Sequence, residues 1–283
     1  MNSTLRLWTQ LGLGTALAGG LLAACGEVAG GEGATGEAGG QSAAVAGEGE
    51  SGARQAVAAP APGGEGEGGV AVADAGSDPV AYGIALAVAE AHVIAARDAY
   101  LAGKQDAAAE MFAHPASEVL VEMDPVFATL GVKDFKPLLA EASMAAADGK
   151  SAAEVGKRYE AIIAALRDAG TKAPTSEAPE GVIATSILAD QIERASAMYR
   201  IAAKDDRYEP YLDGYGFYKV AQTGFARWGA TIRAANPAAH ARITEALAVL
   251  GKAYPAATRP ARLRVAQGAL SAASSKVMLA ASN

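Results

Sequence analysis

Cysteine is almost absent from this chain of 283 residues, which contains only Cys25. An intramolecular disulfide is therefore excluded. Strand signals are also lacking, because nothing in the sequence reads as a β-strand. The motifs of common enzymes are missing too: there is no His-Glu-x-x-His, no Gly-x-Ser-x-Gly and no phosphate-binding loop with Lys-Ser/Thr. We therefore predict no catalytic residue and a protein that is not an enzyme.

Net charge is nearly absent from the larger part of the chain, although the whole carries −7. Between Gly26 and Asp78 there are nine acidic residues against Arg54 alone, so the acidity lies in this segment. The remainder is close to neutral and offers no electrostatic basis for binding nucleic acid. The acidic segment has no aromatic residue up to Gly76 and is rich in Gly, Ala and Glu. Such a composition buries too little apolar surface to fold, so residues 25–77 are predicted to form a disordered tether.

The N-terminus has the features of an export signal. A positive charge at Arg6 precedes an apolar stretch from Leu7 to Leu22, the order found in signal peptides. The stretch is shorter than the roughly 20 residues of a membrane span and is interrupted by glycines. We therefore predict a signal peptide over residues 1–24.

The residues that close this stretch, Leu22-Ala23-Ala24-Cys25, resemble the lipobox of bacterial lipoproteins. The resemblance implies that Cys25 carries acyl chains such as palmitate and anchors the protein to a membrane. Gly26 stands where proteobacterial lipoproteins retained at the inner membrane tend to have Asp. By that analogy the protein is expected at the outer membrane, facing the periplasm.

Helical signals continue from Asp78 to Asn283 and predict an all-α bundle of about seven to nine helices over residues 78–283. Asp78-Pro79 supplies an N-cap and a proline at the first helical position. Helix breaks are expected at His114-Pro115 and at Asp124-Pro125, and glycines are expected to interrupt a late helix at positions 214 and 216. The expected helices cover about 79–101, 106–114, 134–148, 181–204 and 209–235. A further helix is expected to begin at a capping box formed by Ser151 and Glu154. The last two helices are expected to begin at Asn236 and Thr258.

Two of the three histidines are spaced so that they would meet. Gly103 lies eleven residues after His92 and eleven before His114. If the chain folds back at Gly103, both side chains lie about 16 Å from the turn, at about 1.5 Å per residue. Glu118 and Glu122 follow His114 at intervals of four and would share its helical face. Imidazoles and carboxylates bind zinc, iron or copper, so these four residues form a candidate metal site; the alternative is a histidine cap and a buried core histidine.

A second candidate group lies in the run from Tyr211 to Tyr218. Here Tyr211, Asp213 and Tyr215 surround glycines, which permit a close approach of the backbone. These three residues are candidates for lining a pocket. Aromatic packing at the start of a helix is the alternative interpretation.

The steps His114 to Glu118 (His-Pro-x-x-Glu) and Asp213 to Phe217 (Asp-Gly-x-Gly-Phe) are similar to those of imelysin-like periplasmic proteins associated with bacterial iron uptake. The resemblance implies a helical, exported domain that takes part in metal uptake. The Gly-x-His-x-x-Glu signature of that family is absent, because His92 follows Glu90-Ala91 and precedes Ala95.

The sequence therefore predicts a membrane-anchored periplasmic lipoprotein whose helical domain binds a divalent metal ion in uptake or sensing. Its expected partner is the membrane, through the lipid on Cys25. The alternative function is that of a non-enzymatic envelope protein, structural or interacting, whose helix faces hold a protein partner.

Overall fold

The computed structural model of the chain describes residues 70–282, and this part is all-helical. It contains nine α-helices and no strand, as the sequence predicts. The lipobox and Cys25 lie outside the described residues, as does most of the segment assigned to the tether. The elements in chain order are η1 (Val72–Asp74), α1 (Pro79–Leu101), α2 (Gln105–Pro115), η2 (Ala116–Leu120), α3 (Asp124–Leu130), α4 (Lys136–Ala147), α5 (Ala152–Gly170), α6 (Glu180–Ala202), α7 (Glu209–Ala235), α8 (Pro237–Ala253) and α9 (Gln267–Ala281).

Side-chain caps start three of the helices where the sequence indicates them. The Asp78 carboxylate accepts a hydrogen bond from the Val80 amide at 2.8 Å, at the start of α1. Ser151 and Glu154 form the expected capping box at the start of α5. The Asn236 side chain accepts from the Ala239 amide at 2.9 Å and opens α8. Each cap satisfies an amide that the first helical turn leaves without a partner.

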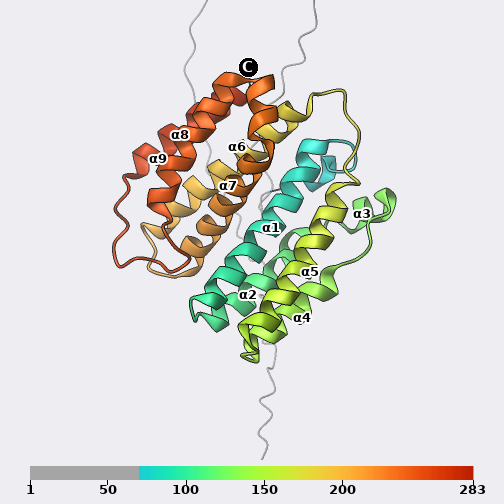
Figure 1. Cartoon of the computed structure of the whole chain (residues 1–283), viewed down its shortest axis with the longest axis vertical. Coiled ribbons are helices and arrows are strands. Elements are labelled where there is room, and N and C mark those ends of the chain that lie inside the picture. The colour runs from blue at the N-terminus through green and yellow to red at the C-terminus, as the bar shows by residue number, and fades with distance from the viewer. Residues whose placement is uncertain (1–69, 283) are drawn as a thin grey trace, which may run out of the picture. The chain divides into compact units, whose positions relative to one another are not determined.

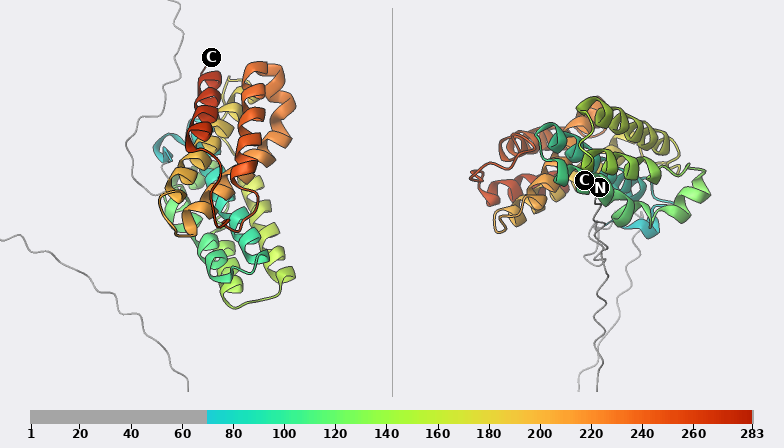
Figure 2. Two further views of the ribbon diagram at one scale, coloured as in Figure 1. Left: turned by 90° about the vertical axis from the view of Figure 1, so that its left-hand side faces the viewer. Right: turned by 90° about the horizontal axis from the view of Figure 1, so that it is seen from below.

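Helix α1 is the centre of the bundle. It packs against α2 and α5 on one side and against α6 and α7 on the other, as Figure 1 shows. Helices α8 and α9 cover α6 and α7 at one flank, and α4 lies against α2 and α5 at the other; Figure 2 shows the two flanks from below. Because it is enclosed by other helices, α1 is buried along most of its length.

Helix α1 is also long and apolar enough to cross a membrane by length and composition, and no other helix among the described residues is. In the bundle, however, 78% of its apolar stretch is buried against other helices. A central core helix meets the same criteria as a membrane span, since both need an apolar surface on all sides.

Three expectations about helix boundaries are wrong. Helix α2 continues through His114-Pro115 into the π-helical turn η2, so His114 lies in its last turn rather than at a cap. The wider turn accommodates a proline that has no amide hydrogen to donate. Gly214 and Gly216 do not interrupt α7, because both are buried in close helix contacts. The last helix begins at Gln267 rather than near Thr258, after an irregular connection.

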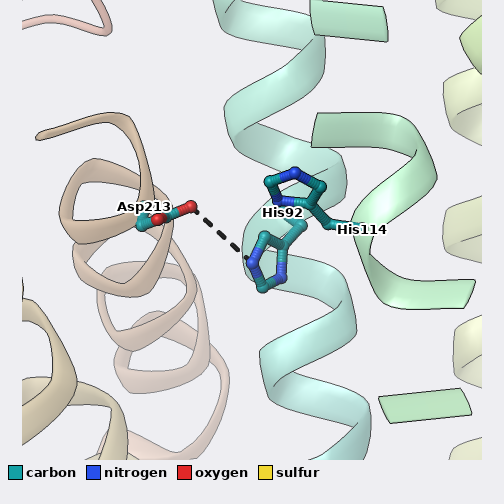
Figure 3. A group of neighbouring side chains, drawn as sticks. All are labelled: His92, His114 and Asp213. Atoms are coloured by element: carbon teal, nitrogen blue, oxygen red, sulfur yellow. Dashed lines mark ion pairs between the residues drawn. The ribbon is translucent and has the colours of Figure 1, made fainter. Parts of the chain in front are cut away.

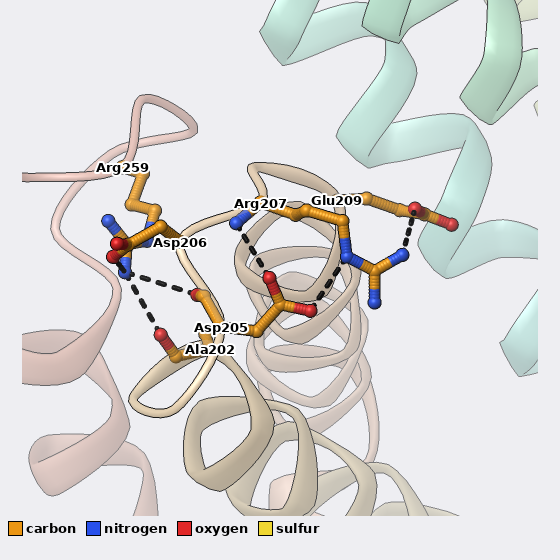
Figure 4. A network of polar contacts seen from close by, with 6 residues as sticks. All are labelled: Ala202, Asp205, Asp206, Arg207, Glu209 and Arg259. Carbon is orange, nitrogen blue, oxygen red and sulfur yellow. Dashed lines mark hydrogen bonds and ion pairs between the residues drawn. The ribbon is translucent and has the colours of Figure 1, made fainter.

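A polar network fixes the turn that leads from α6 into α7 (Figure 4). The Arg207 backbone amide and Nε donate to the Asp205 carboxylate at 2.9 and 2.7 Å. Arg259, from the connection between α8 and α9, donates to the carbonyl oxygen of Ala202 at 3.0 Å and to that of Asp205 at 3.4 Å. The Ala202 carbonyl ends α6, and the Asp205 carbonyl belongs to the turn that follows. Arg259 thus satisfies the last carbonyl of the helix and ties the turn to it. The network thereby sets where α7 begins.

Candidate metal centre

The turn at Gly103 brings the two histidines of the α1–α2 hairpin together, as their spacing predicts. Gly103 has a φ of +74°, in the left-handed region that glycine enters without steric cost. The chain reverses there, and the His92 and His114 rings lie edge to face with centroids 5.6 Å apart. Counting residues from the turn was therefore sufficient to pair these side chains.

A third helix supplies a carboxylate from the opposite side. A Cβ added to Gly216 would lie 2.4 Å from the carbonyl oxygen of Ala91, so α7 approaches the backbone of α1 more closely than any larger residue would permit. Asp213 precedes Gly216 by one helical turn and faces α1. Its Oδ1 lies 3.7 Å from His92 Nε2, as Figure 3 shows.

Glu118 lies between the two imidazoles. Its Oε2 is 3.6 Å from His92 Nε2, and its Oε1 is 3.4 Å from His114 Nδ1. The residue belongs to η2, the π-helical turn, a distortion that often occurs at functional sites. The carboxylate therefore reaches both rings at once.

The separations of these atoms suit a metal ion. One ligand atom each from His92, His114 and Asp213 can be chosen so that all three lie within 4.8 Å of one another. Bonds of about 2.1 Å in a tetrahedral site place neighbouring ligand atoms about 3.4 Å apart. The contacts of His92 Nε2, at 3.6 and 3.7 Å, exceed that spacing by only a few tenths of an ångström.

Burial and a backbone hydrogen bond determine the protonation of His92. Its Nδ1 lies 2.9 Å from the carbonyl oxygen of Val88, which only accepts, so Nδ1 carries the hydrogen. Burial lowers the pKa of His92 to about 4; the Val88 carbonyl opposes this shift, while His114 and Arg194 add to it. Above that pH, Nε2 presents a lone pair toward Asp213 and Glu118.

Burial also acts on Asp213, in the opposite sense. Removal from water raises the pKa of its carboxyl well above the usual value, and the charges of Glu209, Glu118 and Glu110 raise it further. Its Oδ1 is buried and forms no hydrogen bond within the described part of the protein. A buried acceptor without a partner is costly, and such atoms are rare unless a ligand or water satisfies them.

Not every candidate residue joins this cluster. Glu122, expected to share the face of Glu118, is exposed and lies outside the group of ligand atoms. The π-helical turn and the turn after it break the four-residue periodicity on which that expectation depended. Tyr211 is buried and donates to the carbonyl oxygen of Ala256 at 2.9 Å. Tyr215 is also buried and donates to Asp98 Oδ2 at 2.7 Å.

The two tyrosines thus contribute to the core, whereas Asp213 from the same run joins the histidines. No local pattern links Asp213 to His92, 121 positions earlier. The glycines at 214 and 216 were the only sequence signal, because they indicate a close backbone approach without naming the partner. Phe217, whose ring lies edge-on to His92 at 5.9 Å, was not a candidate residue at all.

Comparison with known proteins gives no relative: no protein-family model matches the chain, and neither a curated protein nor a solved structure does. The lipobox and the likeness to imelysin-like proteins therefore remain predictions from short motifs.

Proposed function

We propose that the helical domain binds a divalent transition-metal ion through His92, His114 and the carboxylates of Asp213 and Glu118. The site would serve uptake or sensing of the metal in the cell envelope. Histidine nitrogens with carboxylate oxygens suit zinc, iron and copper, so the donor set defines this class of metal without selecting one member.

The observation that carries the proposal is the convergence of His92, His114 and Asp213, whose ligand atoms can be chosen to lie within 4.8 Å of one another. With the hydrogen of His92 on Nδ1, its Nε2 lone pair faces Glu118 Oε2 at 3.6 Å and Asp213 Oδ1 at 3.7 Å. These separations are too long for hydrogen bonds, and a proton on Asp213 would not bridge them. A cation bound by His92, His114 and Asp213 would satisfy the buried Asp213 Oδ1, which has no hydrogen-bond partner among the described residues.

The surroundings of the ligands agree with this function. A metal-binding histidine commonly donates its other ring nitrogen to a carbonyl, which fixes the tautomer and the ring orientation. His92 makes this hydrogen bond with Val88. The Phe217 ring packs edge-on against His92 and limits its rotation. The site is thus oriented before a metal arrives.

The test is a titration of the full chain with zinc, and with iron(II) under anaerobic conditions. His114→Ala removes one ligand and is expected to weaken binding by at least tenfold. Glu122→Gln is the matched control, because Glu122 is exposed and adjacent in sequence but outside the cluster; its affinity should equal that of the parent.

Equal affinities of the parent and His114→Ala would exclude this site. Such a result would favour the other function predicted from the sequence, an envelope protein that holds a protein partner. Separate titrations of Asp213→Asn and Glu118→Gln would show which carboxylate coordinates, since loss of a ligand weakens binding more than loss of a neighbouring charge.

We further propose that the domain is attached to a membrane by lipid on Cys25. The support is the sequence Leu22-Ala23-Ala24-Cys25 together with the absence of any other cysteine. Several acyl chains hold a protein stably, at about 0.8 kcal/mol for each buried methylene. Cys25→Ser should abolish incorporation of radiolabelled palmitate and release the protein from membranes; labelling that persists in the variant would refute the anchor.

A further inference from the structure

A partly open cavity lies on the other side of α1 from the histidines. It has a volume of about 300 Å³ and is walled by α1, α5, α6 and α7. Small-molecule sites begin at about this volume. At about 30 Å³ for each water, it would hold about ten water molecules, or a ligand of about ten non-hydrogen atoms.

Small residues create this space. Ala87, Gly170, Ala173 and Ala184 line it from three helices and the loop after α5. A Cβ added to Gly170 would meet only Leu86 Cδ1, at 4.0 Å, so the wall there is open. The rest of the lining is largely apolar and includes Trp228. The interior therefore favours a hydrocarbon or aromatic group over water.

Two guanidinium groups contribute to the lining of the cavity. Arg167 is held by Glu90, a buried carboxylate on the wall, through a bidentate pair in which Nη1 lies 2.6 Å from Oε2. Arg227 lies over the Trp228 ring, with Cζ 4.4 Å from the centroid. Among the described residues no carboxylate pairs with Arg227, and Arg167 retains N–H groups that Glu90 does not use. Both groups are thus oriented and still able to donate.

A second acidic residue, Glu180, lines the cavity besides Glu90. It lies in the first turn of α6, where the positive end of the helix dipole stabilises a carboxylate. Glu180, Arg167 and Arg227 are all exposed, and Arg167 is in addition held by its pair with Glu90. The charged hydrogen-bond donors in the lining belong to the two arginines.

We propose that this cavity binds a small amphipathic carboxylate, with its apolar body between α1 and α6 and its carboxylate at Arg167 and Arg227. Guanidinium groups recognise carboxylates through paired hydrogen bonds. An unbranched carboxylate of eight carbons has about ten non-hydrogen atoms and matches the volume. This site is separate from the metal centre and does not depend on it.

The fluorescence of Trp228, which lines the cavity, can report ligand binding. The chain has two tryptophans, Trp8 and Trp228, so in a full chain with Trp8→Phe the fluorescence comes from the cavity alone. Titration with octanoate below its micellar concentration should give a saturable change. Octanol, which has the same body without the charge, should bind about tenfold more weakly, as expected for the loss of one charge-assisted contact. Equilibrium dialysis with radiolabelled octanoate counts the sites independently of fluorescence.

Different variants test the contact of the ligand's carboxylate and the contact of its apolar part. Arg227→Gln should weaken octanoate binding by about tenfold and leave octanol unaffected. Arg233→Gln, an exposed arginine on the same helix that does not line the cavity, is the matched control and should bind like the parent. Ala173→Leu fills the cavity and should weaken both ligands, while Glu180→Gln should strengthen octanoate binding.

Several results would overturn the proposal. These results are no site counted by dialysis, equal binding of octanoate and octanol, and binding of octanoate by Arg227→Gln that equals that of the parent. Tighter binding of octylammonium than of octanoate would assign the polar contact to Glu180 and Glu90 instead. Since Arg227 and Arg233 are both exposed, these variants should fold, which a thermal unfolding curve for each would verify.

Discussion

His92 shows at the scale of one residue how a polar side chain is retained in an apolar helix. The side chain is buried, and one ring nitrogen is satisfied by the carbonyl of Val88. Its other nitrogen faces the oxygen atoms of Glu118 and Asp213. Each of these groups would be more stable in water, so the folded protein holds them together at a cost that a bound cation would offset.

Proton release on metal binding should depend on Asp213. Burial raises the pKa of this carboxyl, so at pH values below the raised pKa a metal must displace its proton. His92 has a pKa of about 4 and is already unprotonated above about pH 5, so it releases none. The number of protons released at Asp213 should therefore rise as the pH falls through the raised pKa of this carboxyl.

Calorimetric titrations in two buffers of different ionisation heat count these protons. Asp213→Asn is the reference, measured at saturating metal, because protons released by other groups are common to both proteins. The prediction fails if the difference between parent and variant does not change with pH.

Asp213→Ala should make the metal-free protein more stable. The substitution removes a buried oxygen without a hydrogen bond and places a good helix former in α7. We expect the free energy of unfolding in the presence of a chelator to rise by about 1–2 kcal/mol. Urea denaturation measures this change, and metal should then stabilise the parent but not the variant. A variant less stable than the parent in chelator would show that the carboxylate has a structural role.

Some residues of this candidate site could be predicted from the sequence and others could not. His92 and His114 belong to one hairpin, so helical rise and a glycine turn were enough to pair them. Asp213 reaches them through a contact between helices far apart in the chain, and no local spacing encodes that contact. The prediction that Glu122 belongs to the site was wrong for a local reason, because Pro115 and the π-helical turn changed the helical period.

At the scale of the element, α7 is defined by how closely it lies against α1. Gly216 sits against the carbonyl of Ala91, and a Cβ there would lie 3.2 Å from Ala95 Cβ as well. The low helix propensity of glycine costs about 1 kcal/mol at such a position. The close packing of α7 on α1 therefore requires glycine at position 216 in spite of its low helix propensity. For this reason the expectation of a helix break at this glycine was wrong.

Gly216→Ala should disturb both stability and metal binding. The added methyl would lie 2.4 Å from the Ala91 oxygen, so α7 must move away from α1 and carry Asp213 with it. We expect a loss of about 1–3 kcal/mol in the free energy of unfolding, as for other overpacked cores. Metal affinity should fall by at least tenfold in a titration.

Gly156→Ala is the matched control, because a Cβ at this position in α5 would meet nothing within 4 Å. It should raise the free energy of unfolding by up to about 1 kcal/mol and leave the metal affinity unchanged. Equal metal affinities in the two glycine variants would show that the α1–α7 distance does not control the site.

Helix ends were predicted well where a side chain made a local hydrogen bond, and less well elsewhere. Asp78, Ser151 and Asn236 each cap a helix at the expected place. No helix begins at Thr258, because contacts from distant residues hold the connection before α9. Tyr208, for example, donates a hydrogen bond to the Ala257 carbonyl at 2.7 Å. Such contacts depend on the assembled bundle and leave no local signal.

At the scale of the whole molecule, the bundle is built around one helix that contributes residues to both proposed sites. Glu90 and His92 are two residues apart on α1, so their side chains point about 200° apart, given 3.6 residues per turn. One faces the cavity and pairs with Arg167, and the other faces the metal centre. Among the buried residues of α1, only Glu90 and His92 carry a carboxylate or an imidazole.

Glu90 lies at the midpoint of α1, which spans Pro79–Leu101, and this has a consequence for export. On the proposed route, α1 passes unfolded through a protein-conducting channel that opens sideways into lipid. An apolar helix of this length would partition into the bilayer and stop there, whereas an ionisable residue at its centre opposes insertion by about 3 kcal/mol. Glu90→Leu should therefore leave part of the protein integrated in the inner membrane and resistant to carbonate extraction. Glu110→Leu, at an exposed position of α2, should be exported normally. If both variants are exported alike, Glu90 has no part in keeping α1 out of the bilayer.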